Sequence, residues 1–185
     1  MHAPPSDVRL ATPASNPLLA PYIAFDGVAG PDPRHVNGSA VADGLCRIIE
    51  VEGPVLAKRA YDLYLRGCGI KRLGGDLKST MNKALANAIR DGRVISVNEA
   101  NKNGLIFSTV RVSGSPDVKA RQRGPRTFDE IPPGELRHVA RTLLDRYDVT
   151  SGADEHLRAI LEVFDLKRLT TQVGTSLLDI LDRRG

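Results

Sequence analysis

Apolar residues recur at helical spacing along most of the chain after residue 38, and this periodicity predicts six helices. Side chains three and four positions apart share one face of a helix, so each apolar stripe marks a face that turns inward. The predicted helices cover about residues 39–52, 56–66, 76–90, 135–147, 154–164 and 170–181. Ser39 is the expected N-cap of the first helix. The glycines of Gly67–Gly69 are expected to end the second, because glycine adopts the left-handed conformations of a helix terminus.

Two stretches rich in β-branched residues, 93–97 and 105–112, predict a pair of strands. Asn and Gly in the loop 98–104 between them are typical turn residues, so the strands should form a hairpin. Three helices, with a glycine turn before the third, followed by a hairpin, are the elements of a winged helix-turn-helix in chain order. We therefore predict an α+β, mostly helical fold, with a winged helix-turn-helix over residues 39–113. Three helices and a hairpin also pack in other ways, so this arrangement is one of several.

The second half of the chain predicts a further helical unit over residues 134–185. Ile70-Lys71-Arg72-Leu73 recurs 96 positions later as Leu166-Lys167-Arg168-Leu169, a short internal repeat. We therefore expect a second three-helix, winged-helix-like unit that reaches Gly185 without a full wing. Residues 1–38 are rich in Pro, Ala, Gly and Ser and predict a flexible or loosely packed segment. Residues 114–133 predict a basic Pro/Gly linker between the units.

The net charge of +4 is unevenly distributed along the chain. Residues 1–55 hold three Lys and Arg against six Asp and Glu, and residues 127–185 hold 8 against 11. Residues 56–126 hold 15 against 5, which is a local net charge of +10. A basic segment that coincides with a predicted winged helix favours binding to a polyanion. The alternative is an ordinary solvated basic face.

Helical geometry selects the side chains of the third helix that would face a nucleic acid. With about 100° per residue, the face opposite the apolar stripe carries small, amide and basic side chains. The predicted contacts on this helix are Ser79, Asn82, Lys83, Asn87 and Arg90. Lysine and arginine pair with phosphates, arginine also with guanine, and asparagine has the amide geometry that recognises adenine. Lys78 falls near the apolar edge and is a weaker candidate.

Further contacts are predicted in the two loops beside this helix. Lys71 and Arg72 precede it in the turn, where cations suit a phosphate near a helix N-terminus. Lys102 and Asn103 lie in the hairpin loop, which has a single cation and therefore predicts a modest wing. The linker arginines either follow a duplex backbone or keep the linker soluble.

Several classes of function are disfavoured by the composition and motifs. Aromatic residues make up 4% of the chain and Trp is absent, which argues against binding single strands by stacking. The chain has no apolar run of about 18–20 residues and no secretory h-region, and its scattered Cys and His predict neither disulfides nor a zinc site. We expect a cytoplasmic protein without membrane contact, cofactor, metal or catalytic residues. Glu50 and Glu52, at a helix end, are interpreted as capping and solubilising residues.

Three short runs carry a family resemblance: Ile49–Val55, Gly69–Gly74 and Ile131–Leu136. Together they resemble a bacterial domain of unknown function that lies at the C-terminus of large superfamily-one helicase proteins. The resemblance implies a tandem winged-helix-like accessory domain that helps a DNA- or RNA-processing machine hold its substrate. The chain has no helicase motifs of its own, and the family has no established residue-level site to carry over.

The sequence therefore predicts a non-enzymatic nucleic-acid-binding protein with a preference for duplex DNA. It would act as a regulator or as an accessory module with a helicase or nuclease partner. The alternative is a protein–protein adaptor that uses the same scaffold, with its acidic second half against a basic surface. Dimerisation through the C-terminal helices is a third hypothesis, because it would present two winged helices to paired half-sites.

Overall fold

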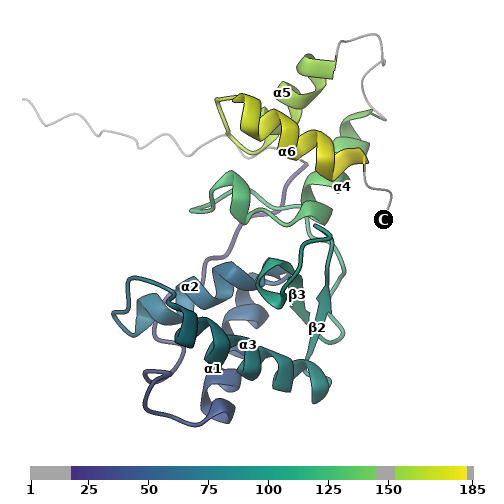
Figure 1. Cartoon of the computed structure of the whole chain (residues 1–185). Helices are drawn as coiled ribbons and strands as arrows, with labels where there is room; N and C mark the ends of the chain where they lie inside the picture. The colour runs from purple at the N-terminus through teal and green to yellow at the C-terminus, as the bar shows by residue number, and fades with distance from the viewer. Residues whose placement is uncertain (1–17, 145–152, 183–185) are drawn as a thin grey trace, which may run out of the picture.

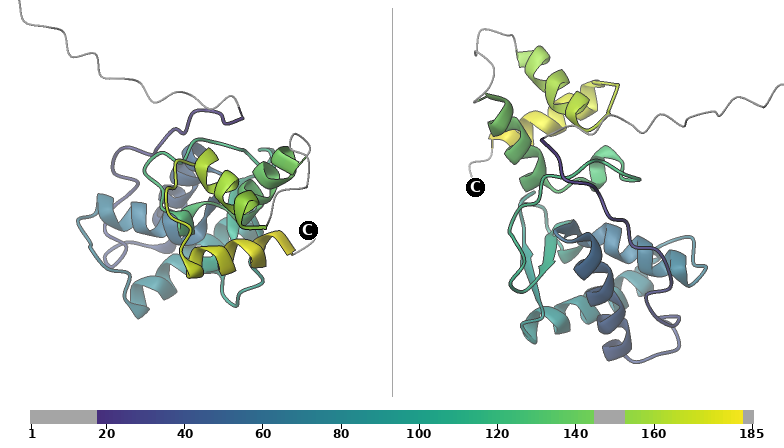
Figure 2. Two further views of the ribbon diagram at one scale, coloured as in Figure 1. Left: turned by 90° about the horizontal axis from the view of Figure 1, so that it is seen from above. Right: turned by 180° about the vertical axis from the view of Figure 1, so that it is seen from behind.

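The computed structural model describes residues 18–144 and 153–182 and shows two helical units, one above the other in Figure 1. About half of the described residues are helical, and a small antiparallel sheet makes the fold α+β. The lower unit contains α1, α2, α3 and the sheet, and the upper unit contains α4, α5 and α6 (Figures 1 and 2). Within these residues no helix is both long and apolar enough to cross a membrane.

The first unit places three helices against a three-stranded sheet. Its helices are α1 (Gly38–Glu52), α2 (Ala57–Gly67) and α3 (Gly75–Arg90). Its strands are β1 (Val55–Leu56), β2 (Val94–Val97) and β3 (Thr109–Val112). The strands pair in the order β1-β3-β2, with Val55 opposite Val110 and Val94 opposite Val112. The predicted hairpin of β2 and β3 is therefore present, and β1 pairs with the other edge of β3.

The apolar stripes of the three helices meet in one core. Leu45 of α1, Tyr61 and Tyr64 of α2, and Met81 and Leu85 of α3 are all fully buried there. The packing of this core requires a glycine at position 44. A Cβ added at Gly44 would lie 2.4 Å from Cε2 of Tyr64, closer than packed atoms approach, so the ring occupies the space that a side chain would need.

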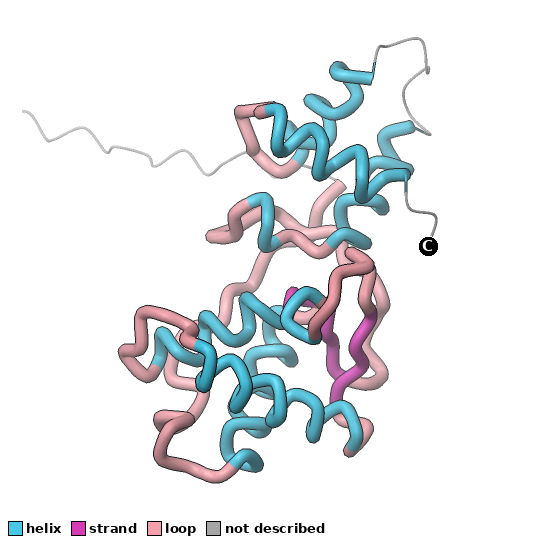
Figure 3. Tube along the Cα trace, in the orientation of Figure 1, coloured by secondary structure: helices cyan, strands magenta, loops and turns pink. Residues whose placement is uncertain are grey.

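The second unit has its own core. It comprises a 3-10 turn, η2 (Phe128–Glu130), followed by α4 (Pro133–Leu144), α5 (Ala153–Val163) and α6 (Thr171–Asp182). Leu136, Ile160, Phe164 and Leu177 are almost fully buried at its centre. The loop segments outside helices and strands, pink in Figure 3, include the stretch before α1 and the connection between the units.

The stretch before α1 contacts both units. Leu19 is buried in the second core, whereas Ala29 is buried in the first. Between them, Ala20 pairs with the inter-unit connection: its N–H donates to O of Ala120 at 3.0 Å, and its carbonyl accepts from N of Gln122 at 2.8 Å. The described part of the predicted flexible segment, residues 18–38, is therefore packed along the molecule; residues 1–17 lie outside the described residues.

The structure corrects several predicted boundaries. The N-cap of α1 is Asn37, whose side chain accepts from N of Ala40 at 3.0 Å, and not Ser39. The predicted strand 105–112 is divided, because Leu105–Phe107 forms a 3-10 turn (η1) and only Thr109–Val112 is a strand. β1 was not predicted, since two residues carry no periodicity. The end of the predicted helix 135–147 falls partly outside the described residues.

Candidate nucleic-acid interface

The outer face of α3 is open to solvent because its opposite face packs on α1. Ala84, Leu85 and Ala88 are fully buried against that helix and the rest of the core. Of the residues predicted on the outer face, three are exposed; these are Ser79, Lys83 and Arg90. Lys78, placed near the apolar edge by its position in the sequence, is exposed as well.

The two predicted asparagines are less available. Oδ1 of Asn82 accepts a hydrogen bond from the Tyr61 hydroxyl at 2.9 Å, and this bond ties α3 to α2. Burial raises the pKa of Tyr61 well above its usual value, so the hydroxyl stays protonated as a donor. Asn87 is half-buried, near the start of α1. Asn82 thus has a structural partner that helical spacing alone did not reveal.

The turn before α3 brings cations together around a hollow. Lys71 and Arg72 are exposed and line a cavity of about 610 Å³ together with Arg66 and Lys58. One carboxylate, that of Asp62, also lines it and pairs with Lys58 at 2.7 Å. The lining therefore carries four cations against one anion.

The hairpin loop is attached to the second unit. Lys102 and Asn103 are exposed, and the side chain of Asn98 shapes the loop by two hydrogen bonds, with N and O of Lys102, at 3.2 and 3.0 Å. Glu99 pairs with Arg137 of α4 at 2.9 Å, with both side chains 12% exposed. The wing predicted from sequence is consequently held toward α4, with its single lysine over the ring of Phe107.

Ion pairing separates the cations of residues 56–126 into two groups. Six of the fifteen are paired with a carboxylate: Lys58, Arg59, Arg93, Arg111, Arg121 and Arg126. Lys71, Arg72, Lys83 and Arg90 have no ion pair with any other described residue. Eight exposed cations of this segment have no ion pair with a described residue. Six of them lie on α3, in the turn before it or beside that turn, and the other two are Lys102 and Lys119.

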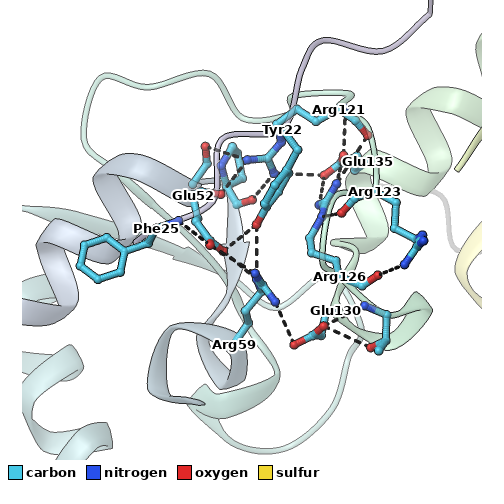
Figure 4. A network of polar contacts seen from close by, with 12 residues as sticks. Tyr22, Phe25, Glu52, Arg59, Arg121, Arg123, Arg126, Glu130 and Glu135 are labelled. Carbon is cyan, nitrogen blue, oxygen red and sulfur yellow. Dashed lines mark hydrogen bonds and ion pairs between the residues drawn. The ribbon is translucent and has the colours of Figure 1, made fainter. Parts of the chain in front are cut away.

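Three arginines of the basic segment lie inside the molecule, in a network shown in Figure 4. The carboxylate of Glu52 is fully buried and accepts from Nε of Arg59 at 2.6 Å, from the Tyr22 hydroxyl at 2.6 Å and from N of Phe25 at 2.9 Å. Arg59 also pairs with Glu130 of the second unit at 3.1 Å. The interpretation of Glu52 as a solubilising residue is wrong, because it is the centre of a buried ion pair.

The same network continues through the inter-unit connection. Glu135 of α4, 2% exposed, pairs with Arg126 at 2.9 Å and with Arg121 at 3.1 Å. Arg121 also donates to O of Glu52 at 2.6 Å and to O of Pro54 at 2.7 Å. These two arginines were expected in an exposed linker, but they are 4% and 1% exposed and join the end of α1 to the start of α4.

Tyr22 lies at the centre of this network. The guanidinium carbons of Arg126, Arg121 and Arg59 lie 4.2, 5.2 and 5.9 Å from its ring centroid, which is cation–π distance. Burial, followed by the hydrogen bond to Glu52, raises the pKa of Tyr22 to about 12. Three arginines face three carboxylates here, so the network is neutral overall and acts as an internal joint between the units.

Comparison with known proteins finds no match, whether among family models, curated proteins or solved structures.

Proposed function

We propose that the chain is a non-enzymatic nucleic-acid-binding protein whose first unit is a winged helix. The element order of this unit supports the proposal: α1, β1, α2, α3, then β2 and β3 in one antiparallel sheet. In that arrangement α3 is the recognition helix and the loop between β2 and β3 is the wing. Duplex DNA is the favoured ligand, since an exposed helix fits the major groove of B-DNA.

The observation that carries the proposal is the set of exposed, unpaired cations on α3 and in the turn that precedes it. Lys83 and Arg90 project from the outer face of α3, and Lys71 and Arg72 project from the turn that precedes it. All four are exposed and have no ion pair with a described residue, so binding to phosphates would not require an internal pair to break. The wing, fastened by the pair of Glu99 with Arg137, contributes a single lysine.

Fluorescence anisotropy of the whole chain with a labelled duplex, over a series of salt concentrations, tests this function. Four phosphate contacts give a slope of log affinity against log salt of about −4. Affinity should then fall roughly 10²-fold between 50 and 200 mM salt. Changing Lys83→Glu together with Arg90→Glu removes two contacts and should reduce the magnitude of the slope by about two.

A matched control separates a specific surface from general charge. Lys119→Glu with Arg141→Glu makes the same change in net charge at two exposed positions away from α3. This control should retain most of the affinity and the original slope. Absence of binding at low salt, or equal losses in the two double variants, would refute the proposal.

A protein–protein adaptor is the second candidate, because the second unit has an acidic outer surface. Asp154, Glu155, Glu162, Asp179 and Asp182 are exposed on α5 and α6. Leu178, on α6 among them, is 50% exposed. Such a surface suits a basic partner, for example a helicase or nuclease with which the chain works. Leu178→Ser with Asp179→Lys should then abolish co-purification of that enzyme, whereas Lys83→Glu with Arg90→Glu should not.

A further inference from the structure

The turn between α2 and α3 is repeated, bond for bond, between α5 and α6. Each pair of equivalent atoms is separated by 96 residues, the offset of the sequence repeat. N of Ile70 donates to O of Leu65 at 2.9 Å, and N of Leu166 donates to O of Leu161 at 2.9 Å. Positive backbone φ angles occur at equivalent positions, +72° at Gly69 and +53° at Asp165. The second unit therefore contains a true copy of the first helix-turn-helix.

The hollow beside the turn is also repeated. All seven residues that line a cavity of about 380 Å³ at the second turn are equivalent to residues that line the basic hollow at the first. Leu161, Lys167 and Leu169, for instance, correspond to Leu65, Lys71 and Leu73. The copy thus keeps a hollow at the same place beside the turn, although the second hollow is smaller.

Most charges differ between the two copies, and the turn itself gains the exposed Asp165 at the position of Gly69. Lys58, Arg66 and Lys83 of the first copy are replaced by Asp154, Glu162 and Asp179 of the second, and all six are exposed. The Lys-Arg pair is kept: Lys71 and Arg72 recur as Lys167 and Arg168, all four exposed and none in an ion pair with a described residue. An anion approaching the second copy would therefore be repelled from α6. It would be attracted by Lys167 and Arg168 at the turn and by Arg158 of α5, against the nearby carboxylates of Glu162 and Asp165.

The two turns lie on the same side of the molecule. They lie at the left in Figure 1 and at the right in the right-hand view of Figure 2. α3 and α6 both run along the front face of the molecule in Figure 1. The buried network of Glu52, Arg59, Arg121, Arg126 and Glu135 joins the units, so the separation of the two turns is set by the fold.

From these observations we propose that the two turns form a two-point clamp on the phosphate backbone of one duplex. Lys71 and Arg72 bind it beside the helix that enters the groove, and Lys167 and Arg168 bind it again at a fixed distance along the same nucleic acid. The acidic face of α6 keeps the second unit out of the groove. This inference rests on the proposed function and adds that the ligand is a duplex long enough to reach both turns.

Binding of the whole chain to a series of duplexes of increasing length tests the clamp. For the unaltered chain, affinity should rise stepwise at the length that first reaches the second turn. Lys167→Glu with Arg168→Glu should abolish that step and lower the magnitude of the salt slope by about two on long duplexes. Binding to short duplexes should stay unchanged. Lys71→Glu with Arg72→Glu should weaken binding at every length.

The controls distinguish failure of the clamp from failure of the proposed function. Lys119→Glu with Arg141→Glu should keep the step, and circular dichroism of each variant should match that of the unaltered chain, because all the altered side chains are exposed. If the chain binds duplexes but the step is absent, or Lys167→Glu with Arg168→Glu leaves it intact, the clamp is refuted and the proposed function stands. If no duplex is bound, both fail.

Discussion

Replacing Glu135 with alanine should destabilise the folded chain by about 3–5 kcal/mol, the cost of breaking a buried ion pair from one side. The carboxylate is 2% exposed and balances two guanidinium groups that are 4% and 1% exposed, those of Arg121 and Arg126. It accepts four hydrogen bonds, one from the backbone of Arg121 and three from the two guanidiniums, at 2.9–3.1 Å. Without it, two buried positive charges lose their shared counterion.

The loss of folding free energy depends on the hydrogen bonds that Arg121 and Arg126 retain without Glu135. Arg121 still donates to carbonyls of Glu52 and Pro54, and Arg126 still donates to carbonyls of Gln122 and Arg123. Those contacts preserve part of the hydrogen bonding but none of the charge compensation. Hydrogen bonds to charged groups contribute about 1.5–3 kcal/mol each. Several of these hydrogen bonds are lost together, and the remaining bonds to carbonyls offset part of the loss. The expected loss of folding free energy is therefore again about 3–5 kcal/mol.

Urea denaturation followed by circular dichroism measures this loss. Lys58→Ala is the control, because it removes an exposed ion pair with Asp62, and such pairs contribute about 1 kcal/mol or less. Glu135→Gln keeps the shape of the side chain without its charge and should fall between the two, which preserves the test if Glu135→Ala fails to fold. If Glu135→Ala and Glu135→Gln both cost no more than Lys58→Ala, the network does not stabilise the joint and the reasoning fails.

Four smaller perturbations, one of them in the same network, are each measured by the free energy of unfolding. The folded pKa of Tyr22, about 12 against a usual 10.0, implies stability that is complete below pH 10 and lost as pH rises toward 12; Tyr22→Phe should flatten this fall. Gly44→Ala should cost about 1–3 kcal/mol by pushing on Tyr64. Gly69→Ala should destabilise the fold by about 1 kcal/mol, because Gly69 has a positive φ that alanine adopts only with strain. Asp165→Gly should instead stabilise it, because Asp165 also has a positive φ.

The helices were predictable because apolar periodicity is a local property of the sequence. All six predicted helices are present, and the starts of α2, α3, α5 and α6 lie within one residue of prediction. Where the prediction failed, the deciding contact was not periodic. Asn37 caps α1 through a single side-chain hydrogen bond. The two residues of β1 form a strand only because they pair with β3. Such contacts depend on where the rest of the chain lies.

The candidate interface was predictable only in part, for the same physical reason. Exposure of Ser79, Lys83 and Arg90 follows from helical geometry, but the partner of Asn82 belongs to another helix. A count of charges along the sequence does not distinguish a solvated arginine from an internal one. Arg121 reaches a carbonyl 69 residues away in sequence, a contact that local patterns do not contain. Two prolines and several acidic residues follow the linker arginines, yet no spacing rule pairs them.

The buried network changes what the positive charge of this chain means. Arg59, Arg121 and Arg126 account for three of the ten excess charges in residues 56–126, and their counterions, Glu52, Glu130 and Glu135, lie outside that segment. The excess available to a ligand is therefore nearer +7 than +10.

The remaining excess of positive charge lies mainly at the first turn and on α3. Apart from the internal arginines, most of the exposed, unpaired cations of residues 56–126 lie on α3 and at the turn before it, and Lys167 and Arg168 lie at the repeated turn. In the proposed interface the internal arginines would have another role, because they join the two units and so set the distance between the two turns. A protein that used these arginines on its surface would bind polyanions more strongly but would lack a fixed spacing between its units. The proposed clamp requires the second property, and the buried positions of Arg59, Arg121 and Arg126 between the units are consistent with it.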